Sequence, residues 1–286
     1  MPFGDRNRTI NSIIVYLLLT LALSSIFYVL IARHPMDKPG GQGYVFALMW
    51  CPGIAGLLTR LIFQGNLRGH GFGWGKTKYQ FASYWIPLAY ASAVYLPIWF
   101  AGYFDANSPM LARFTERVPT LPHAFAFLVL FLVLATVGVL SSCVSTLGEE
   151  LGWRGFLVPE LAKVTSYSRV SFISGAAWAL WHYPVILFGG YHASAPLWYS
   201  MLCFTILVFG ASFLFAWMRL KSGSLWTGVI LHASHNLFIQ AFFDMFTRPS
   251  RVKAYWTSEF GAGLALVLVV VALICYRKRA ELPVPS

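Results

Sequence analysis

Charged residues are scarce in this sequence: they make up 11% of the 286 amino acids, whereas hydrophobic residues make up 58%. A soluble domain carries about 25% charged residues, so this deficit excludes a chain that exposes most of its surface to water. The net charge of +11 would suit nucleic-acid binding, but the basic residues form short clusters between long apolar runs, as in membrane-protein loops. The composition therefore predicts a membrane protein that does not bind nucleic acid.

Cysteine is also sparse, and its spacing forms no metal or redox motif. None of the four cysteines belongs to a CxxC pair or to a Cys/His cluster: Cys51, Cys143, Cys203 and Cys275. This pattern excludes a disulfide framework and a thiolate zinc site. The HExxH signature of zinc metalloproteases is missing as well. We interpret the cysteines as small packing residues.

Long apolar runs account for most of the chain. A transmembrane helix needs about 20 largely apolar residues, and eight segments meet or approach that length: 10–32, 44–63, 79–101, 122–147, 170–188, 197–218, 224–246 and 257–276. The predicted fold class is all-α, a polytopic membrane protein with about eight transmembrane helices around a polar cavity. We expect three N-terminal helices, a core of four helices, and a last helix with a basic tail, over residues 1–121, 122–246 and 247–286.

The loops differ in basic charge. With eight spans, 14 of the 21 Lys and Arg residues fall on the side that holds both termini, and 7 fall on the other side. Cytoplasmic loops carry the excess of basic residues. Both termini are therefore expected in the cytoplasm, with the chain in the plasma or inner membrane of the cell.

One loop superficially resembles a phosphate-binding motif. The glycine-rich stretch Arg68–Lys76 lies between the second and third spans, but no strand precedes it and its spacing does not match a phosphate loop. We interpret it as a flexible basic loop at the membrane surface.

Acidic residues are the rarest charged type, yet Glu149 and Glu150 are adjacent at the end of the fourth span. Ionisable groups inside membrane spans cost roughly 2.5–3.5 kcal/mol each on insertion scales, so those that are retained suggest function. On a helix, Glu150 and Arg154 are four residues apart and share a face, which favours an ion pair. Glu149 then points about 100° away and is free to act as a base. The alternative is an ordinary helix end with one ion pair.

Two further spans carry polar residues at helical spacing. Trp178 and His182 are four residues apart in the fifth span, and His232 and Asn236 are four apart in the seventh, with His235 beside them. The alternative for these residues is packing and interhelical hydrogen bonding. Measured from the cytoplasmic side, His182 would lie about 18 Å deep and His232 about 12 Å deep. The sequence thus predicts one polar cavity, open to the cytoplasm, that collects these groups.

The motifs, in this order, resemble the CPBP family, which comprises CAAX prenyl endopeptidases and bacterial relatives tied to bacteriocin processing and immunity. The resemblance covers residues 122–246 and rests on Glu149-Glu150-x-x-x-Arg154, aromatic-x-x-x-His182, His232-x-x-x-Asn236 and the lead-in Lys221–Trp226. The second motif usually begins with Phe, and Trp178 takes that place here. The resemblance implies an intramembrane endopeptidase that cleaves a membrane-embedded or prenylated peptide or protein.

The resemblance also implies a role for each motif residue. Glu149 would activate the attacking water, and His182 would help to hold or polarise that water. Glu150 and Arg154 would form the supporting ion pair. The predicted catalytic set is completed by two residues that would stabilise the oxyanion of the tetrahedral intermediate, His232 and Asn236.

The same residues bear on two further questions, which group acts as the nucleophile and whether the site holds a metal ion. No Ser–His–Asp or Cys–His constellation is present, so water is the expected nucleophile. Zinc remains open, because Glu149, His182 and His232 would supply three ligands and leave one position free. The same residues also suit a metal-free glutamate site, which we favour, and no cofactor is predicted.

Two other functions remain open. A non-proteolytic immunity factor or scaffold of the same fold would retain the motifs as a structural core. A proton-coupled transporter would use intramembrane Glu and His in a relay, although no inverted repeat or pair of broken helices is evident. The sequence does not specify the substrate, its cleavage site or the oligomeric state.

Overall fold

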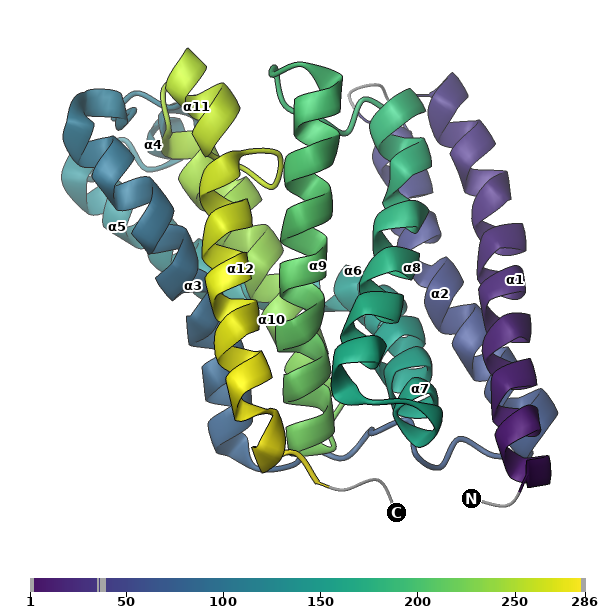
Figure 1. Cartoon of the computed structure of the whole chain (residues 1–286). Helices are drawn as coiled ribbons and strands as arrows, with labels where there is room; N and C mark the ends of the chain where they lie inside the picture. Colours follow the sequence, from purple (N-terminus) through teal and green to yellow (C-terminus); the bar gives the residue numbers. More distant parts are fainter. Residues whose placement is uncertain (1–2, 35, 37–39, 284–286) are drawn as a thin grey trace.

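The computed structural model describes residues 3–34, 36 and 40–283, and most of these residues lie in helices (Figure 1). One isolated antiparallel bridge joins Phe104 to Thr247. The helices are α1 (Phe3–Arg33), α2 (Gly41–Gln64), α3 (Thr77–Ile98), α4 (Pro109–Arg117), α5 (His123–Val133), α6 (Val139–Gly152), α7 (Val158–Val164), α8 (Tyr167–Phe188), α9 (Leu197–Ser222), α10 (Trp226–Asn236), α11 (Arg251–Trp256) and α12 (Ala262–Arg277). Short π or 3-10 segments extend some of them: η1 (Trp99–Tyr103), η2 (Leu134–Gly138), η3 (Trp153–Leu157), η4 (Leu237–Phe243), η5 (Asp244–Phe246) and η6 (Lys278–Glu281).

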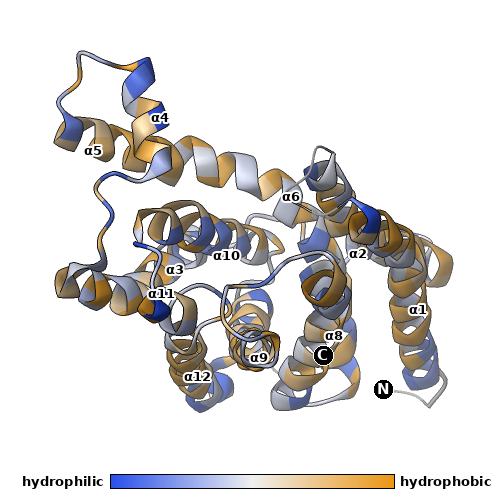
Figure 2. Cartoon of the chain, turned by 90° about the horizontal axis from the view of Figure 1, so that it is seen from above, coloured by the Kyte–Doolittle hydropathy of each residue, from blue (hydrophilic) through white to orange (hydrophobic). Residues whose placement is uncertain are grey.

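Within the described residues, six helical runs are long and apolar enough to cross a membrane: Asp5–Arg33, Gly41–Gln64, Thr77–Tyr103, His123–Val164, Tyr167–Phe188 and Leu197–Ser222. Hydrophobic residues predominate along α1 in Figure 2. Many large apolar side chains are exposed on the bundle, and Leu140 and Phe188 are among the most exposed. An apolar surface of this extent is stable in contact with lipid. The predicted all-α polytopic membrane fold is confirmed.

The seventh predicted span, 224–246, is one helical run, because α10, η4 and η5 follow one another from Trp226 to Phe246. The eighth is shorter than expected: in place of 257–276, α12 has 16 residues and begins at Ala262. Neither is among the six runs that are long and apolar enough to cross a membrane, whereas eight were expected. Ser258, with φ 62°, turns the chain before α12. Glu259 therefore lies in a loop rather than in a membrane span.

The fourth span differs most from its prediction. It continues past residue 147 without a break, because α5, η2, α6, η3 and α7 form one helical run of 42 residues, His123–Val164. Glu149 and Glu150 consequently lie inside a long helix and not at its end. The π turn η3 follows them directly, and π turns within helices are frequent at functional sites.

Glycines let this helix pack closely against α2 beyond the expected end of the span. A Cβ added to Gly53 would lie 2.4 Å from the carbonyl oxygen of Gly148. A Cβ added to Gly152 would lie 2.4 Å from the carbonyl oxygen of Pro52. Here Gly is required for the close approach of α2 and α6, as in other membrane helix pairs with small residues at the interface. The contact fixes the segment that carries the two glutamates against α2.

Different elements of the chain lie at the two ends of the bundle. The first residues of α1 and the last of η6 lie at one end, which we call the terminal end, and α4 and α11 lie at the opposite end (Figure 1). The lead-in Lys221–Trp226 forms the α9–α10 turn at the terminal end, where Ser224 Oγ accepts from the Trp226 N–H at 3.2 Å and donates to the Gly73 carbonyl at 2.7 Å. The first residues of α1 and the last of η6 therefore share one end of the bundle, as expected for helices next to the two termini.

Candidate active site

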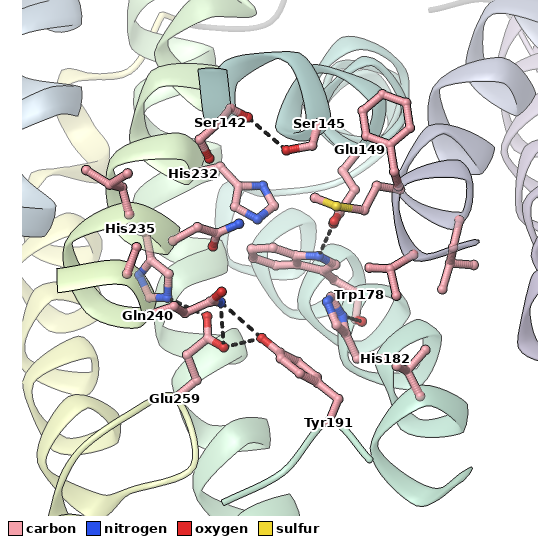
Figure 3. A pocket seen from close by; sticks show the side chains of 18 of the residues that line it. Ser142, Ser145, Glu149, Trp178, His182, Tyr191, His232, His235, Gln240 and Glu259 are labelled. Atoms are coloured by element: carbon pink, nitrogen blue, oxygen red, sulfur yellow. Dashed lines mark hydrogen bonds and ion pairs between the residues drawn. The ribbon is translucent and has the colours of Figure 1, made fainter. Parts of the chain in front are cut away.

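Glu149 extends from α6 towards the indole of Trp178 on α8. Its Oε2 accepts a hydrogen bond from Trp178 Nε1 at 2.9 Å, and the residue is 2% exposed (Figure 3). The sequence motif indicated only an aromatic packing role for Trp178. Because Phe has no N–H, the donor depends on Trp occupying this position, so one oxygen of Glu149 is oriented and its other oxygen remains available.

Glu150 sits one residue further on and belongs to a separate, fully buried ion cluster. Its Oε1 accepts from Arg154 Nη1 and from His232 Nδ1, each at 2.9 Å. The Arg154 guanidinium is stacked between two rings, 4.2 Å from the centroid of Trp178 and 4.0 Å from that of Phe215. The ion pair expected from the i, i+4 spacing forms, and it holds His232 as well.

Gly228 of α10 makes room for this cluster. A Cβ at Gly228 would lie 2.7 Å from Glu150 Oε2. That oxygen is buried without a hydrogen-bond partner in the described part of the chain. The fit of α10 against α6 therefore depends on the absence of a side chain at Gly228.

His182 faces the cavity from α8. Its Nδ1 lies 2.9 Å from the Trp178 carbonyl, and a carbonyl only accepts, so Nδ1 carries a proton and the neutral ring has its lone pair on Nε2. The ring packs edge-on against Trp181, with centroids 4.8 Å apart. Asn236, one turn beyond His232, lines the same cavity. The structure thus collects Glu149, His182, His232 and Asn236 around one cavity.

The cavity has a volume of about 730 Å³ and extends from Glu149 to the opposite end of the bundle. Met36, Tyr191 and Glu259, which belong to loops at that end, line both this cavity and an outer one of about 930 Å³, so the two cavities adjoin there. Towards the terminal end, the cavity is lined by Trp178 and Phe215, the two rings that stack on the Arg154 guanidinium. The prediction that it opens on the side of the termini is therefore wrong, because the long helix carries the glutamates away from its own end.

A second polar cluster forms the outer wall of the cavity, and of its residues only His235 was expected from the sequence. Glu259 accepts from His235 Nε2 at 2.9 Å, from Gln240 Nε2 at 3.1 Å and from the Tyr191 hydroxyl. Burial disfavours ionisation of Glu259, but His235 and these hydrogen bonds outweigh it and lower its pKa to about 2. Glu259 was an acid within an apparent apolar run, which was the available signal.

The zinc site left open by the sequence does not fit this arrangement. Among the described residues, no group of three His, Cys, Asp or Glu side chains is placed to hold a metal ion. The expected ligands Glu149, His182 and His232 line the cavity without forming such a group. No step of the chemistry below is assigned to a metal.

Comparison with known proteins gives a consistent result. Residues 122–238 match the family model described as Type II CAAX prenyl endopeptidase Rce1-like. A segment of 136 residues is 29% identical to CAAX prenyl protease 2 of Methanococcus maripaludis, and it covers 46% of this chain and 46% of that relative. The chain thus matches about half the length of its curated relative. The match covers the segment that carries all six predicted site residues.

Proposed function

We propose that this chain, a member of the CPBP family of intramembrane proteases, is an endopeptidase that uses Glu149 to activate water. The observation that carries the proposal is the buried Glu149 carboxylate, oriented by Trp178 within a cavity that also presents His182, His232 and Asn236. Of the two adjacent glutamates, only Glu149 lines the cavity. Glu150 is occupied by Arg154 and His232.

In the proposed reaction, Glu149 removes a proton from a water molecule whose second hydrogen bond is accepted by His182 Nε2. The water oxygen attacks the scissile carbonyl and forms a tetrahedral intermediate. Glu149 then returns the proton to the leaving nitrogen as the C–N bond breaks, which leaves a carboxylic acid and an amine. No covalent enzyme intermediate is needed.

His232 and Asn236 are assigned to the oxyanion. Glu150 accepts from His232 Nδ1 and stabilises the imidazolium form, in which Nε2 also carries a proton and donates towards the cavity. The Asn236 amide supplies a second donor. Preorganised donors of this kind often provide the largest single contribution to acyl-transfer catalysis.

The substrate class proposed is a membrane-embedded or lipid-modified peptide. Apolar residues such as Val45, Phe46 and Val144 line the cavity beside its polar groups, and Phe46 and Val144 are also exposed on the outside of the bundle. The cavity therefore reaches the lipid-facing surface between α2 and α6. A peptide anchored in the bilayer would enter there without leaving the membrane.

The orientation is part of the proposal. Both termini are assigned to the cytoplasmic side of a cell membrane on the basis of basic charge. Since the cavity mouth lies at the opposite end, it would then face away from the cytoplasm. Access from that side or from the bilayer replaces the cytoplasmic access expected from the sequence.

The experiment is cleavage of a prenylated or membrane-anchored reporter peptide by purified protein in liposomes. Wild-type protein should cleave it, and Glu149→Gln and His232→Ala should lose this activity while remaining folded. If a cellular phenotype of the chain persists in both variants, a scaffold or immunity role explains it and the protease proposal fails. Uptake driven by a pH gradient in the same liposomes, without cleavage, would instead favour a transporter.

A further inference from the structure

A second polar cavity lies at the terminal end, on the far side of Arg154 from the active-site cavity. It has a volume of about 630 Å³ and is lined by residues of α2, the α2–α3 loop, α7 and the end of α9: Arg60, Leu67, Arg68, Gly69, Gly71, Phe72, Gly73, Pro159, Lys163, Arg219 and Gly223. Arg60 and Arg219 are buried, whereas Arg68 and Lys163 are exposed. The cavity therefore has a cationic floor and a cationic rim.

Arg219 is a buried cation without an acidic partner. It is 5% exposed, and its side chain donates to two carbonyls, Arg154 O at 2.8 Å and Gly69 O at 3.0 Å. No ion pair involves Arg219 in the described part of the chain. A buried charge that is only partly hydrogen-bonded is costly unless a counter-charge is present.

Arg60, the second floor residue, shares its only carboxylate with another cation. Arg60 Nη2 and Lys163 Nζ lie 2.9 and 2.6 Å from the same oxygen of Glu160. Arg60 Nε is buried with no hydrogen-bond partner among the described residues. Four cationic side chains line the cavity and no carboxylate does in the described part of the chain, so the cavity carries an excess of positive charge.

The glycine-rich α2–α3 loop covers this floor closely instead of lying free on the surface. Gly69 and Gly71 both have φ 85°, and a Cβ at Gly71 would lie 2.7 Å from Arg219 Nη2. His70 between them is buried, and burial together with the charges of Arg60 and Arg219 lowers its pKa to about 4. His70 is neutral at physiological pH, since protonation would add to the same unbalanced charge.

We infer that this cavity binds a phosphate group, contacted by Arg60 and Arg219 on the floor and by Arg68 and Lys163 at the rim. Guanidinium groups match the oxygens of phosphate in geometry and charge. The contacts differ from those of a phosphate loop, because side chains and not backbone N–H groups supply them. This site is independent of the proposed protease chemistry.

The phosphate belongs either to an anionic lipid headgroup or to a soluble molecule. The position at a bundle end favours contact with headgroups, since basic pockets between membrane helices bind them. Exposed Phe72 and Trp74 in the same loop are typical of residues at the membrane interface. The experiment below distinguishes the two sources.

The test is thermal unfolding of the whole protein in neutral detergent, with inorganic phosphate in one arm and phosphatidylglycerol in the other. A ligand that binds only the folded state raises the unfolding temperature in a concentration-dependent way. The rim variant Arg68→Gln should weaken the apparent affinity about 10-fold, because one charge-assisted contact is lost. Arg279→Gln, an exposed arginine at the same end but outside the cavity, is the matched control and should bind as wild type does.

A shift with both ligands that is reduced in Arg68→Gln indicates a general phosphate site. A shift with the lipid alone, again reduced in Arg68→Gln, assigns the site to a headgroup. The inference is overturned if neither ligand shifts the unfolding temperature, or if Arg68→Gln and Arg279→Gln reduce the shift equally. Lys163→Gln provides a second rim variant should Arg68→Gln fail to fold.

Discussion

Trp178→Phe is the substitution that most sharply separates the chemistry at Glu149 from packing around it. The change removes the Nε1–H that donates to Glu149 Oε2 at 2.9 Å, and Phe is the residue usual at this position in the family that the motifs resemble. Phe also preserves an aromatic ring beside Arg154, whose guanidinium lies 4.2 Å from the Trp178 ring centroid. The fold should therefore persist while Glu149 loses its orienting donor.

The expected magnitude follows from the type of hydrogen bond. A hydrogen bond to a charged group contributes about 1.5–3 kcal/mol, since removal leaves the carboxylate buried and unsatisfied. If this contribution is needed in the transition state, kcat falls by about 10- to 150-fold. KM should change little, because the Trp178 N–H is occupied by Glu149 and not by substrate.

The assay is steady-state cleavage of the reporter peptide in liposomes, together with thermal unfolding of each variant. Trp99→Phe is the matched control: its half-buried indole donates to Thr247 Oγ1 at 2.8 Å, and it does not line the active-site cavity. Both substitutions remove the same ring volume. The reasoning is refuted if Trp178→Phe retains the wild-type kcat, or if both variants lose activity to the same extent.

Three further predictions concern packing, pH and orientation. Gly228→Ala should lower the unfolding temperature and the cleavage rate, because the new Cβ would lie 2.7 Å from Glu150 Oε2, whereas Gly43→Ala, with no atom within 4 Å, should change neither. The pKa of His70 is lowered to about 4 in the folded protein, so the unfolded state binds more protons between that pH and about 6.5. The unfolding temperature should therefore fall as the pH decreases through this window. The fall should be smaller in His70→Phe, which has no imidazole to protonate. Ser194→Cys lies at the opposite end, and a membrane-impermeant maleimide should label it on intact cells. Asn66→Cys lies at the terminal end and should be labelled only after lysis. The reverse pattern would contradict cytoplasmic termini.

Contacts within one helix were the part of the site that the sequence predicted well. Glu150 and Arg154 are four residues apart, and they form an ion pair at 2.9 Å in the structure. His182 and Trp178 share a face in the same way, and the His182 ring bonds the Trp178 carbonyl. Such contacts depend on helical periodicity, which a sequence contains.

Contacts between helices were predicted less well. The bond from Trp178 to Glu149 joins α8 to α6, and the cluster around Glu259 joins three segments far apart in the chain. Neither depends on local spacing. They depend on how closely helices approach, which glycines such as Gly53 and Gly152 determine through their partners in space.

The same limit explains the error in the position of the cavity. The fourth span was expected to end at residue 147, where the apolar run stops, so the glutamates were placed at the end of a helix that in fact continues to Val164. Hydropathy does not show this continuation. It depends on the close packing of α2 against Gly148 and Gly152.

The central claim is that Glu149, and not its neighbour Glu150, activates the water that cleaves the peptide bond. Its most direct test is the cleavage rate of Glu149→Gln in liposomes, with folding verified by thermal unfolding and with the exposed Glu116→Gln as a control. The account predicts that Glu149→Gln loses all measurable cleavage while it unfolds at a temperature close to that of the wild type, and that Glu116→Gln cleaves normally. Cleavage by folded Glu149→Gln at a rate near that of the wild type would contradict the account.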